Sequence, residues 1–179
     1  AGLGKSEDSP EPKDLQHLVT ELHALLDPAD VPRPCILVGH SLGGAMAQMF
    51  AQQYPKEIAG LVLVDPEDNR LLARLHEKLS PQLWSDRDKA LAQAMPNMSP
   101  GQRKEYIAFM EHGAAQFTPG TLPEVPIVLL TGTQKNPEFP GNPLEQDLKL
   151  ELQDQFVAAA PETEHVLVRG SRHYMQNHV

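Results

Sequence analysis

The sequence predicts an α/β fold in which a mostly parallel sheet is flanked by helices, and three observations support this. Short apolar runs recur along the chain, separated by stretches with helical periodicity. The runs are continuous rather than alternating, which is typical of strands that are covered on both faces. Prolines, 17 of 179 residues, stand between the periodic segments. This alternation favours parallel βαβ units with right-handed crossovers.

The individual elements follow from periodicity and from their boundary residues. Four strands are expected, over 35–38, 60–65, 126–131 and 165–169. Amphipathic helices are expected over 13–27 and 144–160, and a further helix runs from the first strand to Tyr54, where Pro55 ends it. The strand over 35–38 reads CILV and is expected to be buried on both faces.

The stretch between residues 67 and 122 interrupts this alternation. It contains helical segments near 69–79, 86–95 and 100–115, with no strand between them. A connection of this length is too long for an ordinary loop. We therefore predict a core formed by 1–66 and 123–179, and a helical insertion over 67–122 that lies across one end of the sheet. The apolar residues of this insertion are expected either to form pocket walls or to pack against one another: Leu83, Trp84, Met95, Met98, Phe109, Met110 and Phe117.

Composition excludes several classes of function. The net charge is -9 and the basic residues are scattered singly, which argues against a nucleic-acid partner. The apolar runs are too short to span a membrane. The one cysteine, Cys35, allows no internal disulfide, which favours a cytoplasmic location. No His, Cys and Asp residues have the spacing of a metal site, so no metal or other cofactor is expected.

The motif that carries chemistry follows the first predicted strand. Gly39-His40-Ser41-Leu42-Gly43 fits the pattern G-x-S-x-G, and it stands between a strand and a helix. This setting is the one that a nucleophile elbow requires, with the serine hydroxyl projecting from the carboxyl edge of the sheet. The Leu42 N–H lies at the start of the helix, where it can stabilise an oxyanion. The alternative interpretation of Ser41 is a helix cap after a glycine-rich turn.

A serine nucleophile needs a base, and position selects one among the 8 histidines. His173 follows the last strand through Gly170-Ser171-Arg172, which places it at the same sheet edge as Ser41. His165 begins that strand and is expected at the opposite end. His178, a few residues further, is the rival candidate. The geometry of a catalytic triad therefore favours His173.

The base in turn needs an orienting carboxylate. Asp65 ends the second strand, next to the nucleophile strand, and is the preferred candidate. The loop after the third strand offers Glu138 as the second choice and Asp147, inside a helical pattern, as the third. Asp65 could instead serve as a cap or turn residue before Pro66.

With these motifs in view, the chain resembles the α/β-hydrolase superfamily. AGLGKS at 1–6 resembles the loop before the helix that precedes the elbow, GHSLGG the elbow, GLVLVD the next strand, and GSRHYMQ the segment around the family's histidine. The resemblance covers nearly the whole chain except 67–122, which matches the position of the family's cap domain. It implies a partial α/β-hydrolase fold with a cap that covers the pocket and sets substrate choice.

The chain differs from the pattern of this family in two respects. The family places its first strands and one oxyanion donor before the point that corresponds to residue 1, and a closing helix after the histidine, so the chain resembles a fragment. Many members carry the acid after the third of the strands seen here, where this chain has no aspartate. Haloalkane dehalogenases place it where Asp65 stands, but their nucleophile is an aspartate, and Ser41 argues against that chemistry and against epoxide hydrolysis.

The sequence thus predicts a serine hydrolase for a small acyl substrate such as a carboxylic ester, with Ser41, His173 and Asp65 as its triad. Two other classes remain. Gly4-Lys5-Ser6 with Asp65 imitates parts of a P-loop nucleotide hydrolase, but no strand precedes it. The chain could also be a hydrolase-like binding module without activity. Labelling of Ser41 by a phosphonate separates this last class from an enzyme.

Overall fold

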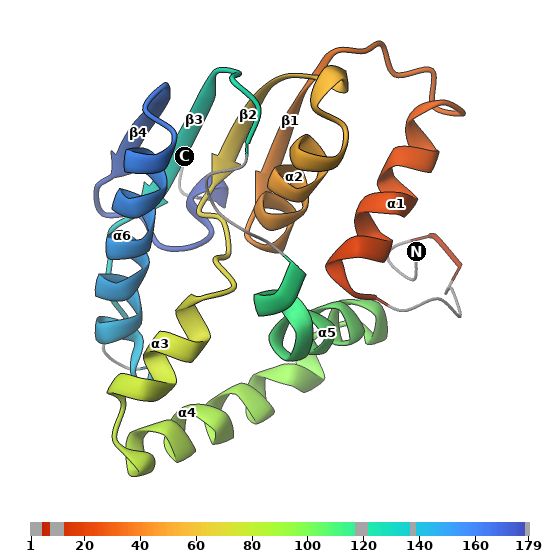
Figure 1. Ribbon diagram of the computed structural model, residues 1–179. Helices are drawn as coiled ribbons and strands as arrows, with labels where there is room; N and C mark the ends of the chain where they lie inside the picture. The colour runs from red at the N-terminus through yellow and green to blue at the C-terminus, as the bar shows by residue number, and fades with distance from the viewer. Residues whose placement is uncertain (1–4, 8–12, 117–121, 137–138, 178–179) are drawn as a thin grey trace.

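The computed structural model describes residues 5–7, 13–116, 122–136 and 139–177 (Figure 1). The helices are α1 (Leu15–Leu26), α2 (Leu42–Gln53), α3 (Leu71–Lys78), α4 (Pro81–Ala94), α5 (Pro100–Gln116) and α6 (Asn142–Ala159). The strands are β1 (Cys35–His40), β2 (Ile58–Val64), β3 (Ile127–Gly132) and β4 (Thr163–Val168). Three short 3₁₀ turns accompany them: η1 (Pro55–Glu57), η2 (Met95–Asn97) and η3 (Met175–Asn177).

The four strands form one parallel sheet in the order β1-β2-β3-β4. Helix α2 connects β1 to β2, and α6 connects β3 to β4. The prediction of a parallel sheet built from alternating strands and helices is confirmed. Since all strands run in the same direction, their carboxyl ends meet at one edge, and the segments that follow each strand are brought together there (Figure 1).

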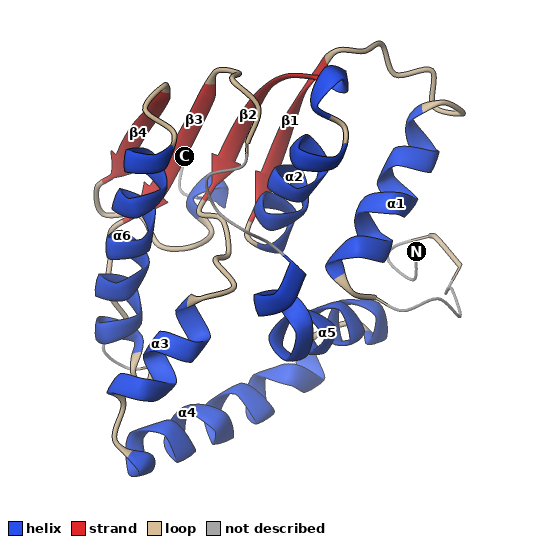
Figure 2. Cartoon of the chain, in the orientation of Figure 1, coloured by secondary structure: helices blue, strands red, loops and turns tan. Residues whose placement is uncertain are grey.

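The core lies between one face of the sheet and the helices that cover it (Figure 2). Alternate residues of the two central strands point into it and are nearly inaccessible to solvent: Leu61, Leu63, Ile127 and Leu129. Phe50 of α2 and Phe156 of α6 belong to the same cluster. Burying an aliphatic or aromatic side chain of this size stabilises the fold by about 1.5–3 kcal/mol.

The expectation that the first strand is buried on both faces is wrong. Ile36 is 63% exposed and Val38 is 70% exposed. Strand β1 is at the edge of the sheet, and these two side chains point to the face opposite α2. A continuous apolar run therefore identified the strand but not its environment, because periodicity within one strand does not report which layers cover it.

Helices α3, α4 and α5 lie beyond the carboxyl edge of the sheet (Figure 1). Helix α3 packs on α6 through a second apolar cluster, in which Leu71 and Leu75 meet Leu148 and Leu152. The helix expected from residue 86 begins five residues earlier, at Pro81, because the Ser80 side chain accepts a hydrogen bond from the Leu83 N–H and proline is favoured in a first turn. The division into a core and an insertion stays a prediction.

None of the helices in the described part of the chain combines the length and the apolar character that a membrane crossing requires.

Candidate active site

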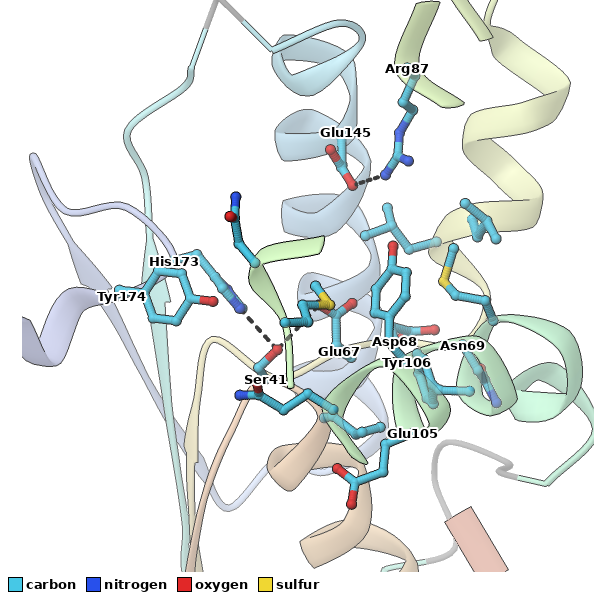
Figure 3. A pocket seen from close by; sticks show the side chains of 18 residues that line it. Ser41, Glu67, Asp68, Asn69, Arg87, Glu105, Tyr106, Glu145, His173 and Tyr174 are labelled. Atoms are coloured by element: carbon cyan, nitrogen blue, oxygen red, sulfur yellow. Dashed lines mark hydrogen bonds and ion pairs between the residues drawn. The ribbon is translucent and has the colours of Figure 1, made fainter. Parts of the chain in front are cut away.

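Three of the predicted site residues lie in hydrogen-bond contact at the carboxyl edge of the sheet, and Figure 3 shows two of them, Ser41 and His173. The His173 Nε2 is 2.9 Å from the Ser41 Oγ, and the His173 Nδ1 is 2.7 Å from the Asp65 Oδ2. A carboxylate only accepts, so Nδ1–H donates to Asp65, and Nε2 of the neutral ring accepts from the Ser41 hydroxyl. The chain serine–imidazole–carboxylate is the arrangement that activates a hydroxyl as a nucleophile.

Ser41 stands in a strained turn between β1 and α2. Its φ of 56° and ψ of -124° are unfavourable for a residue with a side chain. The turn is so tight that two of its glycines have no room for a side chain. A Cβ on Gly39 would lie 2.2 Å from the Gly43 carbonyl oxygen, and a Cβ on Gly44 would lie 2.6 Å from the Pro66 Cβ. A Cβ on Gly43 would meet nothing within 4 Å, so close packing does not explain that glycine.

Asp65 follows β2 directly and its side chain is fully buried. Its backbone has a φ of 44°, and its Oδ1 accepts a hydrogen bond from the Gly132 N–H at 3.1 Å. Burial by itself raises the pKa of this carboxyl, but the hydrogen bond with His173 and the charge of Lys149 outweigh it, so the pKa lies below its ordinary value. Asp65 therefore carries its negative charge toward His173.

His173 is held through its backbone as well as its ring. The His40 Nε2–H donates to the His173 carbonyl oxygen at 2.8 Å, and the two rings lie 4.6 Å apart between centroids. His40, the residue before the serine in the G-x-S-x-G motif, thus orients the loop after β4. The His173 side chain is 34% exposed, which leaves one side of the imidazole open to the cavity.

Leu42 is the first residue of α2. The N–H groups of the first helical turn have no partner within the helix, and the positive end of the helix dipole lies there. Leu42 directly follows Ser41, so its N–H has the place that the sequence predicts for an oxyanion donor.

A cavity of about 650 Å³ opens at this edge, between the elbow and the helices of residues 71–116. Ser41 and His173 line its floor, and apolar walls come from Met98, Phe109 and Met110. Arg87 of α4 pairs with Glu145 of α6 at 2.7 Å, joining the segment beyond the sheet edge to the core (Figure 3). The other apolar residues named with the insertion behave differently: Trp84 packs against the α3–α6 cluster, and Leu83 is 38% exposed.

Glu67 adds an unexpected carboxyl beside the nucleophile. Its Oε1 lies 3.4 Å from the Ser41 Oγ, and its N–H donates to the Ser41 carbonyl at 3.0 Å. Burial raises the pKa of Glu67 above its ordinary value. The His173 Nε2, at 2.9 Å, lies closer to the Ser41 Oγ than this carboxyl does.

The raised pKa of Glu67 leads to a prediction about how the free energy of unfolding depends on pH. Glu67 ionises at its ordinary pKa in the unfolded chain but at a higher pH in the folded one. The contribution of Glu67 to the free energy of unfolding is thus fully present below the unfolded-state pKa of 4.5. It is lost as the pH rises through the higher pKa of the folded state. Glu67→Gln should therefore raise the free energy of unfolding at pH 8 and change it less at pH 4.

Urea denaturation of Glu67→Gln at both pH values measures this difference. The exposed Glu77 of α3 provides the matched control, since Glu77→Gln should change stability little at either pH. A gain for Glu67→Gln that is equal at pH 4 and pH 8 would contradict the assignment of a raised pKa.

The other candidates of the sequence analysis lie elsewhere. Glu138 and His178, as well as Phe117 and Gly4, lie outside the described residues. Asp147 is exposed and pairs with Lys135. His165 does not begin the last strand, because β4 starts at Thr163; its Nε2 is 2.9 Å from the Thr131 Oγ1, away from Ser41. Lys5 and Ser6 are exposed, and Asp65 faces His173, so the P-loop interpretation has no structural support.

Sequence analysis missed Lys149, whose Nζ lies 2.9 and 2.8 Å from the two oxygens of Asp65. A signal for it exists in the helix pattern. Gln146, Lys149 and Gln153 form a polar stripe at helical spacing beside the apolar face of α6. Both glutamines are buried, and they contact the end of β3: Gln146 donates to the Gly132 carbonyl, and Gln153 accepts from the Thr131 hydroxyl.

In the part of the chain that the structure describes, no group of three or more His, Cys, Asp or Glu side chains is arranged to hold a metal ion.

The fold and this site define a class, and comparison with known proteins identifies it. The family model described as "alpha/beta hydrolase fold" matches residues 1–111, so the chain belongs to the α/β-hydrolase family. Lipase LipV of Mycobacterium tuberculosis is 48% identical over 48 residues, which cover 27% of this chain and 18% of that protein. Human (lyso)-N-acylphosphatidylethanolamine lipase is 35% identical over 69 residues, 36% of this chain and 20% of that protein.

A solved structure resembles nearly the whole chain. The structure of a probable hydrolytic enzyme from Pseudomonas aeruginosa matches with a TM-score of 0.64 and 21% identity, over 99% of this chain and 69% of that one. At this identity the likeness concerns the fold. The matched stretches span about a quarter or less of the length of the curated relatives. The chain is thus a hydrolase-family protein, and its particular reaction is a matter for proposal.

Proposed function

We propose that the protein is a serine hydrolase that acts on carboxylic esters or related acyl compounds through the triad Ser41, His173 and Asp65. The observation that carries this proposal is the hydrogen-bonded chain from the Ser41 Oγ to the His173 ring and on to the buried Asp65 carboxylate. The three residues follow three different strands of one parallel sheet. Such a constellation is recognised by its geometry and by the roles of its members.

The reaction begins when the Ser41 oxygen attacks the carbonyl carbon of the substrate. The hydroxyl proton passes to the His173 Nε2, and the Nδ1–H remains hydrogen-bonded to Asp65, whose charge stabilises the imidazolium. The carbonyl oxygen becomes an oxyanion, and the Leu42 N–H supplies one of its donors. When the bond to the leaving group breaks, the proton on Nε2 moves to that group and an acyl-Ser41 remains.

Hydrolysis of the acyl-enzyme uses the same groups again. Water gives a proton to the His173 Nε2 as its oxygen attacks the acyl carbon, and the proton returns to the Ser41 oxygen when the acid is released. No step of this sequence requires a metal or an organic cofactor.

The cavity suits an acyl substrate. Met98, Phe109 and Met110 offer apolar walls next to the hydroxyl of Ser41. They come from the segment 67–122, which we propose is a cap over a core of 1–66 and 123–179, and which would then select the acyl group. Two of the relatives carry the name lipase, and this agrees with an apolar acyl substrate.

Labelling by a fluorescent alkyl phosphonate tests the proposal. The phosphonate should bond covalently to Ser41, found by mass spectrometry of the peptide that contains it, and p-nitrophenyl esters should compete with the label. Heat-unfolded protein is the control and should not react, since the serine is nucleophilic only beside His173. Absence of labelling in folded protein that hydrolyses no ester, thioester or amide would reject the proposal in favour of a binding module.

A further inference from the structure

A lysine from α6 contacts both carboxylate oxygens of Asp65. The Lys149 Nζ lies 2.9 Å from the Asp65 Oδ1 and 2.8 Å from the Oδ2. The Lys149 side chain is 13% exposed and that of Asp65 is 0% exposed. The proton transfers of the proposed mechanism do not use this ammonium group, so its contact with the triad acid needs another explanation.

The hydrogen bonds at Asp65 show what the lysine does to the carboxylate. The Oδ1 accepts from the Gly132 N–H and from Lys149, whereas the Oδ2 accepts from the His173 Nδ1–H and from Lys149. The imidazole and the ammonium therefore share one oxygen. The charge of Asp65 that stabilises a protonated His173 is partly neutralised by a cation on the same carboxylate.

Helix α6 holds Lys149 in this place. The Gln146 side chain, three residues earlier, donates to the Gly132 carbonyl at 2.6 Å, and Gln153, four residues later, accepts from the Thr131 hydroxyl. Through these two hydrogen bonds the polar stripe of α6 (Gln146, Lys149 and Gln153) contacts the end of β3. The Gly132 N–H of the same strand also donates to Asp65. By contrast, the ion pair of Lys135 with Asp147 is exposed on both sides.

Several other charged or titratable groups lie around His173. Glu67 lies across Ser41, and the rings of His40 and Tyr174 lie 4.6 and 5.1 Å from the His173 ring. Glu145 and Arg172 line the space that adjoins His173 and Lys149. Glu145 is already paired with Arg87. Lys149 differs from all of these because it contacts the carboxylate that binds the ring.

We propose that Lys149 is a positioning residue that fixes Asp65 and divides the charge of this carboxylate between itself and His173, and so sets the pH at which the triad becomes active. The proposal rests on the proposed function, in which His173 is the base. A cation beside Asp65 disfavours the protonated imidazole, so His173 serves as a neutral base at a lower pH than it would beside Asp65 alone.

The test is the pH dependence of kcat/KM for a p-nitrophenyl ester, followed at a wavelength where both forms of the product absorb equally. Lys149→Gln removes the charge and should move the acid limb of the profile upward by about one pH unit. Lys149→Arg keeps the charge and should leave the limb in place. Lys135→Gln removes an exposed lysine that pairs with Asp147 of α6, and it should have no effect.

A second measurement does not depend on turnover. The His173 ring is titrated by NMR in protein with isotope-labelled histidine, and its signal is assigned through His173→Gln. The midpoint should be higher in Lys149→Gln than in wild type, and unchanged in Lys149→Arg. Circular dichroism establishes that each variant is folded, and Lys149→Met replaces Lys149→Gln if the latter is not.

The outcomes separate the two proposals. Coincident acid limbs and coincident ring midpoints in folded wild type and Lys149→Gln would overturn the role of Lys149, even if the protein is an active esterase. A ring midpoint that moves with the charge at position 149, in a protein that hydrolyses no acyl compound, would support the charge division at Asp65 and reject the proposed function.

Discussion

Ser41→Ala is expected to lower kcat for ester hydrolysis by about 10⁴- to 10⁶-fold and to leave KM nearly unchanged. In the proposed mechanism its oxygen forms the bond that replaces the leaving group, and the His173 Nε2 at 2.9 Å activates it. Removing one oxygen atom leaves the fold and the cavity intact. Steady-state kinetics on a series of p-nitrophenyl esters measure the loss.

The backbone at this position supplies the control for Ser41. The residue has a φ of 56°, which glycine adopts without the cost that a Cβ imposes. Ser41→Gly should therefore be as inactive as Ser41→Ala but more stable than it by about 1 kcal/mol in thermal or urea unfolding. Wild-type turnover by either variant would contradict the assignment of the nucleophile.

Sequence reasoning could predict which sheet edge carries the chemistry. Parallel strands bring their carboxyl ends together, so any polar residue directly after a strand is a candidate for the same site. Ser41, Asp65 and His173 satisfy this condition after three strands, and their side chains lie in contact in the structure. This argument needed no knowledge of side-chain packing, and a strand boundary that is wrong by two residues, as at Thr163, did not disturb it.

Reasoning from the ends of strands alone does not lead to Lys149 or to the exposure of β1. Lys149 lies 84 residues from Asp65 in the sequence, within a helix, and a single lysine in a helix is usually exposed. Only the packing of α6 against the ends of β2 and β3 turns it inward. Likewise, the apolar character of Ile36 and Val38 is the same whether or not a layer covers them, so their exposure depends on the arrangement of other elements.

Asp65 illustrates how a turn and an acid role can coincide. The residue has a positive φ of 44° and immediately precedes Pro66, as a turn aspartate would, and yet its carboxylate faces the His173 ring. The position after β3, where the family often carries its acid, is instead closely packed. A Cβ on Gly132 would lie 2.7 Å from the Arg172 carbonyl oxygen. The loop that carries His173 thus approaches β3 through backbone, and the carboxylate that contacts His173 comes from the end of the neighbouring strand β2.

Asp65→Asn is expected to lower kcat by about 10³- to 10⁴-fold. An amide at this position no longer stabilises the imidazolium, and its NH₂ group can turn toward His173 and favour the wrong tautomer. Asp147→Asn, at the exposed pair with Lys135, should keep wild-type activity. Glu138→Gln should also remain active, and a loss confined to this variant would transfer the role of the acid to Glu138.

Lys149 makes it possible to separate the effect of Asp65→Asn on catalysis from its effect on folding. Asp65→Asn leaves the Lys149 ammonium buried without its carboxylate, which should lower the melting temperature as well as the activity. In the double variant Asp65→Asn/Lys149→Met the uncompensated charge is gone, so much of the stability should return. If Asp65 orients and charges the base, activity stays low in this stable double variant. If activity returns together with stability, the carboxylate serves the fold rather than the reaction.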